Sequence, residues 1–92
     1  MKMGYVKPLH ISITIKDGKE AIFKNTKTGK EWTFTKIPVV QIAKLLNDGD
    51  YHSSSDISKK INIGETDVIG YIKPLIKKGL LSDKDDEFLF DN

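Results

Sequence analysis

The chain has 92 residues, of which 38% are hydrophobic and 30% are charged. This length supports one modest core, and this composition excludes a disordered chain, which has too little apolar surface to fold. The absence of cysteine excludes disulfides and thiolate metal sites. No apolar segment approaches the roughly 20 residues that cross a bilayer, so we expect a single cytoplasmic domain over residues 1–92 with no membrane partner.

The charge is unevenly distributed along the chain. Residues 1–37 contain eight lysines and three acidic residues, a net charge of +5, whereas residues 38–92 contain seven lysines and ten acidic residues, a net charge of −3. A charged surface attracts its opposite through a long-range force that salt weakens. The basic N-terminal part is therefore expected to influence the choice of partner.

Three strand patterns lie between residues 9 and 35. Residues 9–16 alternate apolar and polar side chains, which is typical of a strand with one buried face. Asp17-Gly18 supplies the two positive-φ residues of a tight type I′ turn, and a second strand follows over residues 20–24. A longer turn, with Gly29 in a left-handed conformation, leads to a third strand over residues 30–35. The sequence therefore predicts a three-stranded antiparallel β-meander.

Three helical patterns follow over residues 38–81. The first begins with Pro38 in its first turn, where proline costs no helical hydrogen bond. The second begins at Ser53, which with Asp56 approaches a capping box, and the third ends before Gly79. A small sheet is stable only when its apolar face is covered, so we expect this three-helix unit to pack on the meander in an α+β fold.

The third helical pattern and the tail contain two irregular features. Pro74 lies inside the helix, where it costs about 3 kcal/mol, and Gly70 four residues earlier eases the clash with its ring and permits a kink. Residues 82–92 combine an acidic turn over residues 83–86 with the apolar residues 88–90. Both a wing-like hairpin strand and an ordered tail fit this last segment.

The order of the helices is that of a winged helix-turn-helix, which predicts a DNA-binding regulator with its third helix in the major groove. The charges oppose this interpretation, because Glu65 and Asp67 occupy the end of the helix that normally contacts DNA. There is also no arginine in the chain. A basic stripe is still available from Lys59, Lys60, Lys73, Lys77 and Lys78. DNA binding therefore stays as the alternative function.

The third strand offers a different surface. An edge strand presents unpaired backbone N–H and C=O groups with which an extended peptide can pair. Lys27, Lys30 and Lys36 flank this strand and favour an acidic ligand, and the exposed side of the third helix would supply an apolar wall beside it. The same edge can also pair with a second copy of the chain, so a homodimer through the third strand is a competing state.

Four segments between residues 19 and 81 follow a recognisable order. An apolar strand, a glycine turn with an aromatic strand, a helix that ends in an acid-glycine pair and a closing helix with a Gly-Leu-Leu end correspond to Ala21–Asn25, Thr28–Phe34, Ile42–Gly49 and Val68–Leu81. In this order of elements, residues 19–81 resemble the PqqD-like family of RiPP precursor peptide recognition elements. The chain departs from the family at Phe34-Thr35, where Leu-Asn is common, and at Pro74.

The resemblance implies a meander of three strands followed by a three-helix, winged-helix-like unit. It also implies a non-catalytic protein, without cofactor or metal, that binds the leader segment of a ribosomally made precursor peptide by β-strand addition. The protein would present this leader to a modifying enzyme in natural product biosynthesis. Carried over by position, the backbone pairing falls on Glu31, Trp32, Thr33, Phe34 and Thr35, and the groove walls fall on Val68, Ile69, Ile72 and Ile76. Together with Lys30, Lys36 and Lys73, these are the predicted peptide-binding residues.

Several of these residues also have a purely structural interpretation. Trp32 and Phe34 are expected to face inward as core aromatics, and Ile72 and Ile76, with Leu75, must help to close the core. The only two histidines lie in different elements, and no nucleophile motif or phosphate-binding loop is present, so the sequence indicates no enzyme. A general protein-interaction adaptor is the third functional class that fits.

Overall fold

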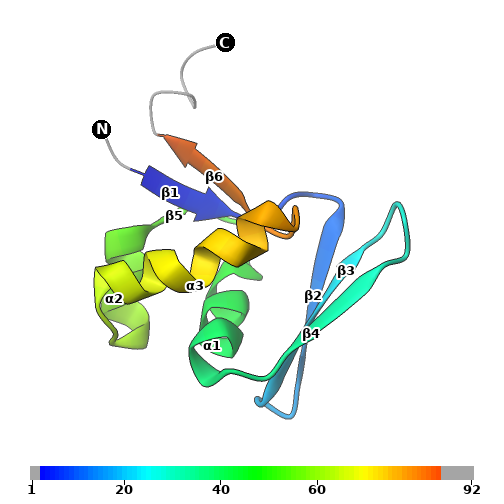
Figure 1. The fold of residues 1–92 in the computed structure, drawn as a ribbon, viewed down its shortest axis with the longest axis horizontal. Coiled ribbons are helices and arrows are strands. Elements are labelled where there is room, and N and C mark those ends of the chain that lie inside the picture. Colours follow the sequence, from blue (N-terminus) through cyan, green and yellow to red (C-terminus); the bar gives the residue numbers. More distant parts are fainter. Residues whose placement is uncertain (1–2, 86–92) are drawn as a thin grey trace.

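The computed structural model describes residues 3–85 of the chain. These residues form an α+β fold with two antiparallel three-stranded sheets and three helices (Figure 1). The strands are β1 (Met3–Val6), β2 (Ile11–Lys16), β3 (Glu20–Asn25), β4 (Glu31–Phe34), β5 (His52–Ser53) and β6 (Ser82–Asp85). The helices are α1 (Ile37–Leu46), α2 (Ser54–Ile61) and α3 (Glu65–Lys77).

The predicted meander is the sheet with strand order β2-β3-β4. Its two turns have the expected geometry: Asp17 and Gly18 have φ values of 56° and 67°, and Gly29 has a φ of 81°. The first strand, however, begins at Ile11. Leu9, which was expected to open this strand with a buried side chain, lies in a turn and is fully exposed.

The second sheet, with strand order β5-β1-β6, was not predicted, and a single meander followed by a helical bundle is therefore the wrong architecture. In this sheet Tyr5 of β1 lies between His52 of β5 and Asp83 of β6. The acidic segment expected to be a turn is thus strand β6, whereas residues 88–90 lie outside the described part of the chain. The backbone of β6 pairs with β1, and this pairing makes the segment a strand. Its polar sequence has no apolar alternation from which a strand could be predicted.

Gly4 is required by close packing within this second sheet. A Cβ atom at this position would collide with the ring of Tyr51, which lies directly over the glycine backbone. Glycine in a strand usually marks such a close approach, at some cost in strand stability. The glycine that makes residues 3–6 a poor strand by sequence is therefore the residue that lets the strand pack.

The helix ends follow the predicted signals. Ser53 caps α2 by accepting a hydrogen bond from the Asp56 amide at 3.0 Å. Gly79 follows α3 with a φ of 75°, and the Leu80 amide donates to the Leu75 carbonyl at 2.9 Å, which forms a Schellman motif. The helix continues through Pro74 to its last residue, Lys77. No helix within residues 3–85 is long and apolar enough to cross a membrane.

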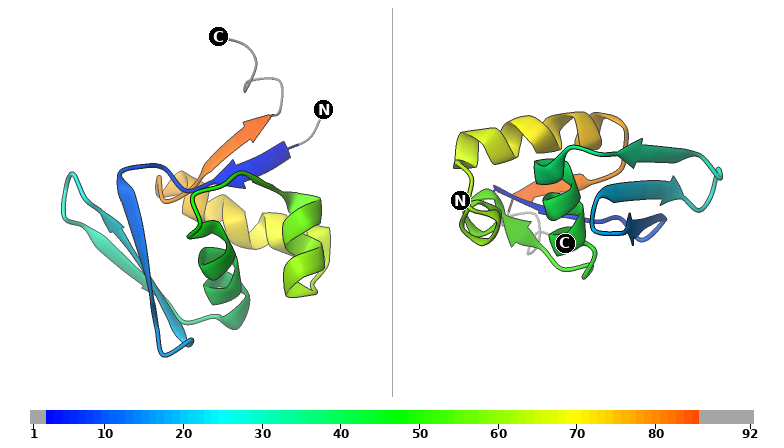
Figure 2. Two further views of the ribbon diagram at one scale, coloured as in Figure 1. Left: turned by 180° about the vertical axis from the view of Figure 1, so that it is seen from behind. Right: turned by 90° about the horizontal axis from the view of Figure 1, so that it is seen from below.

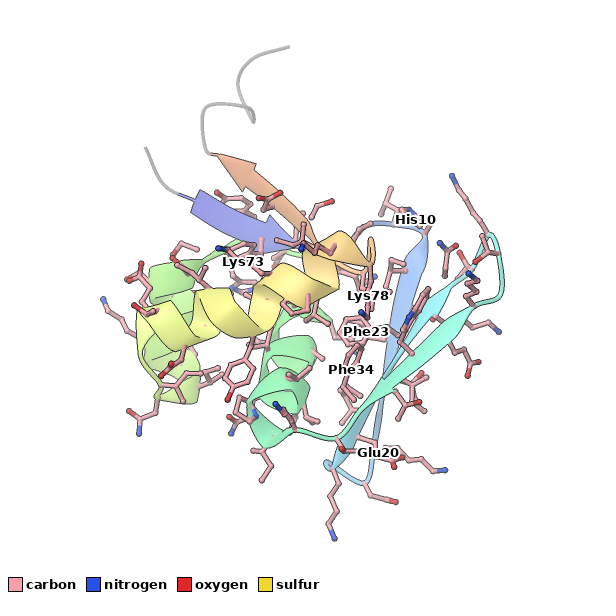
Figure 3. All side chains as sticks on the ribbon, viewed as in Figure 1. His10, Glu20, Phe23, Phe34, Lys73 and Lys78 are labelled. Carbon is pink, nitrogen blue, oxygen red and sulfur yellow. The ribbon has the colours of Figure 1, made fainter. Side chains whose placement is uncertain are left out.

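The hydrophobic core lies where the meander, α1 and α3 meet. Phe23 is completely buried, and its ring meets that of Phe34 edge-to-face at 5.4 Å between centroids (Figure 3). In the view from below (Figure 2, right), β4 is the strand of the meander on the same side of the molecule as α3. The largest fully buried side chains are those of Phe23, Ile11, Ile42, Leu46, Ile57, Ile72, Leu75, Leu80 and Val68.

A buried histidine links the second sheet to α2 and to the turn that follows α1. The Nε2 atom of His52 lies 2.9 Å from a carboxylate oxygen of Asp48, beyond the end of α1, and Nδ1 lies 2.9 Å from one of Asp56 in α2. Both ring nitrogens can donate only in the imidazolium form. Burial lowers the pKa of His52, but the hydrogen bonds and charges of the two carboxylates outweigh it, so the pKa is raised above 6.5.

We expect the protein to lose stability as the pH rises above about 6.5, because the raised pKa of His52 stabilises the fold below that pH and ceases to do so above the folded-state pKa. The melting temperature of the wild type should therefore be higher at about pH 6 than at about pH 9, and that of His52→Gln should change much less between the two. The control is His10→Gln, which removes the other histidine and should retain the wild-type difference. An equal pH dependence in wild type and His52→Gln would contradict this account.

Candidate functional site

A groove lies between the end of β4 and one face of α3, with the start of α1 at its base. Its volume is about 480 Å³, which falls in the range of ligand-binding clefts. We call it the β4–α3 groove. It is lined by Phe34, Lys36, Val39, Thr66, Asp67, Gly70, Tyr71, Pro74 and Leu75.

The base of the groove is apolar because three elements of the core meet there. Val39 of α1 and Leu75 of α3 are buried, and Phe34 of β4 is half-buried with its ring against Phe23. Phe34 therefore belongs both to the core and to the groove. The core aromatic pair fixes the position of this ring, so the base of the groove is preformed.

The rim of the groove carries one charge of each sign. Lys36 is exposed, and its Nζ atom lies 6.0 Å from the centre of the Tyr71 ring, at the outer limit of a cation–π contact. Asp67 is exposed in the first turn of α3, where its charge also favours the helix N-terminus. An anionic group of a ligand would therefore be placed best near Lys36.

The helical wall of the groove exposes backbone. Gly70 is exposed in the middle of α3, and a Cβ atom added there would have no neighbour within 4 Å. Pro74, one turn later, is also exposed and has no backbone N–H. A ligand can therefore approach the backbone of α3 closely at this point.

The outer edge of β4 has no neighbouring strand among the described residues. Within residues 3–85, β4 pairs on one side only, with β3. The Asn25 amide donates to the Lys30 carbonyl at 2.9 Å, so the backbone groups of residues 30, 32 and 34 face β3. The alternate residues Glu31, Thr33 and Thr35 therefore direct their backbone N–H and C=O groups outward, and all three are exposed.

The predicted residues around β4 fall into three groups. Phe34 and Lys36 line the groove. Trp32 is half-buried and packs against the core, in line with its structural interpretation. The exposed residues along the strand and its preceding turn are Lys30, Glu31, Thr33 and Thr35.

The predicted peptide-binding residues of α3 lie outside the groove lining. Val68 and Ile72 are completely buried in the core, and Ile76 packs against it. Ile69 is half-buried and Lys73 is exposed, and none of the five lines the groove. The physical reason is that the most apolar face of an amphipathic helix turns toward the core, so the neighbouring face is left to form the groove wall.

The sequence reasoning missed the α3 residues that form this wall, namely Thr66, Asp67, Gly70, Tyr71 and Pro74. Their spacing of three and four residues places them on one helical face, which is the signal that could have identified them. Their mixed polarity conceals that signal, because only Tyr71 and Pro74 contribute sizeable apolar surface. Phe34 of β4 and Val39 of α1 complete the apolar lining of the groove.

Comparison with protein-family models, curated proteins and solved structures gives no match for this chain. Within residues 3–85, no group of three or more His, Cys, Asp or Glu side chains is placed to hold a metal ion. The candidate functional site is the β4–α3 groove together with the strand edge beside it.

Proposed function

We propose that this protein binds the leader segment of a ribosomally made precursor peptide as an added strand on β4 and presents it to a modifying enzyme. The observation that carries the proposal is the position of the β4–α3 groove beside the open edge of β4. One ligand could then pair with the strand and fill the groove together. The role of the protein is binding and delivery rather than catalysis.

The backbone geometry of β4 supports strand addition. A strand laid against the outward groups of Glu31, Thr33 and Thr35 would gain main-chain hydrogen bonds whatever its sequence. Alternate side chains of that strand would point to one side, where the groove can accept them. The backbone would thus provide affinity and the groove would provide selectivity.

The charges around β4 support an acidic ligand. Lys36 lines the groove, and Lys27 and Lys30 stand in and after the turn that precedes β4. All three side chains are exposed, and residues 1–37 have a net charge of +5. An acidic leader would therefore be attracted to this edge, more strongly at low salt.

Replacing Lys36 with glutamate is expected to weaken binding of an acidic peptide about tenfold or more, because a charge-assisted contact of about 1.5–3 kcal/mol becomes a repulsion. Fluorescence anisotropy with a labelled acidic peptide at low and physiological salt measures this change. Lys16→Glu, at the exposed end of β2, is the control with the same change of charge. Equal losses in the two variants would indicate a bulk charge effect and contradict a ligand at the groove.

Lys30 and Lys36 disfavour a homodimer through β4. Antiparallel pairing of two β4 edges about a two-fold axis at Thr33 would set Lys30 of one copy opposite Lys36 of the other, on both sides of the axis. Like charges directly opposed on neighbouring strands destabilise the pair. Lysines at the ends of an edge strand are a common protection against self-association. This arrangement leaves the edge available for an acidic peptide.

DNA binding is the second candidate, and it is favoured by the exposed lysines Lys73, Lys77 and Lys78 on α3 and at its end. They lie outside the lining of the β4–α3 groove. Against it, Glu65 and Asp67 are exposed at the N-terminal end of the helix, where a recognition helix approaches DNA. The two candidates thus predict contacts on different surfaces, which a single experiment can separate.

A further inference from the structure

At Gly70 a larger side chain would fit without a clash. Gly70 is exposed in the middle of α3, its φ is not positive, and a Cβ atom would meet no neighbour within 4 Å. Glycine at such a position reduces helix stability relative to alanine. The protein therefore retains a destabilising residue at a point where the helix borders the β4–α3 groove.

Pro74 changes the hydrogen bonding of that glycine. In an α-helix the carbonyl of residue 70 accepts a hydrogen bond from the amide of residue 74. Proline has no N–H, and its ring displaces the carbonyl four residues earlier. The Gly70 carbonyl therefore lacks its usual helical donor, and both residues line the groove.

The surroundings of this carbonyl define the donor that would suit it. The rings of Phe34 and Tyr71, with Pro74, form apolar surfaces for a flat group. Lys36, whose ammonium lies 6.0 Å from the Tyr71 ring centre, and Asp67 place opposite charges on the rim, so the lining has no net charge and suits a neutral donor rather than a charged one. An indole combines a flat apolar body with one neutral N–H and meets both requirements.

We propose that the Gly70–Pro74 wall of the groove is a subsite for a tryptophan of the bound acidic peptide. The indole ring packs against Phe34 and Tyr71, and its N–H donates to the Gly70 carbonyl. This inference rests on the proposed function and adds to it a specific residue of the ligand. It also gives the departure of this chain at Pro74 a role in recognition.

The test uses synthetic acidic peptides of glutamate, threonine and valine with one central guest residue. The guest is tryptophan, phenylalanine, alanine, or naphthylalanine, which has the size of tryptophan without the N–H. Binding to the full chain is measured by isothermal titration calorimetry. We expect the tryptophan peptide to bind about three- to tenfold more tightly than the naphthylalanine peptide, as one neutral hydrogen bond allows, and alanine to bind weakest.

The decisive variant is Pro74→Ala, which restores an amide that can donate to the Gly70 carbonyl. The tryptophan and naphthylalanine peptides should then bind with about equal affinity, while the naphthylalanine peptide still binds. Lys73→Ala, next to it but outside the groove lining, is the control and should keep the preference. Circular dichroism verifies that both variants remain helical.

The outcomes separate this inference from the function on which it rests. If wild type binds all four peptides equally, or if Pro74→Ala keeps the full preference for tryptophan, the subsite is overturned and strand addition stands. If none of the peptides binds the wild type, both proposals are overturned. A preference that Pro74→Ala removes and Lys73→Ala retains supports the subsite.

Discussion

Replacing Thr33 with proline is expected to reduce peptide binding about 5- to 150-fold, since an unpaired backbone group in a paired strand costs about 1–3 kcal/mol. Thr33 lies at the middle of the outward-facing residues of β4, and proline would remove its N–H. Because that N–H points away from β3, the sheet should tolerate the change, as edge strands commonly do. Isothermal titration calorimetry with an acidic peptide measures the loss.

Thr33→Ala is the matched control, because it removes the same side chain and keeps the N–H. The two variants should have similar circular dichroism spectra, and only the proline variant should lose affinity. If both bind like the wild type, the ligand does not pair with β4. If both lose affinity equally, the threonine side chain rather than the backbone makes the contact.

Replacing Phe23 with alanine is expected to destabilise the protein by about 3–5 kcal/mol, the usual cost of truncating a buried phenylalanine. Phe23 is completely buried, and its ring supports that of Phe34 at 5.4 Å. Since small domains have about 5–15 kcal/mol of stability in total, much of the fold would be lost. Urea denaturation followed by circular dichroism measures the change.

Ile22→Ala serves as the control for that substitution. Ile22 precedes Phe23 in β3, so its side chain points to the other face of the sheet, where it remains partly exposed. Its truncation should cost clearly less than that of Phe23. A loss for Phe23→Ala of no more than about 1 kcal/mol would contradict its place at the centre of the core. Because Phe34 also lines the groove, the destabilised variant should bind peptide poorly as well.

Local signals in the sequence were sufficient for the meander and the helices. The positive φ of Asp17 and Gly18, the cap at Ser53 and the glycine after α3 depend on interactions within a few residues. The second sheet has no such signal, because Tyr5 pairs with residues about 47 and 78 positions away in the chain, His52 and Asp83. Long-range backbone pairing of short, polar strands leaves no side-chain pattern that a single sequence reveals.

The candidate site was predictable on the strand side and not on the helix side. Edge strands and their flanking lysines can be read from the sequence, and Phe34 and Lys36 do line the groove. On α3, the apolar pattern identified Val68 and Ile72, which are completely buried in the core. A groove wall that contains an aspartate and a glycine is recognisable only once neighbouring elements supply its apolar base.

An NMR titration of the isotope-labelled protein at physiological salt tests peptide capture by β4 directly. One sample receives short acidic peptides encoded beside its gene, and another receives a random DNA duplex. We predict that peptide shifts the amide signals of Glu31, Thr33 and Thr35 together with those of Gly70 and Tyr71, and that DNA leaves them unchanged. Shifts with DNA alone, centred on Lys73, Lys77 and Lys78 with β4 unaffected, would contradict peptide capture and indicate a DNA-binding protein.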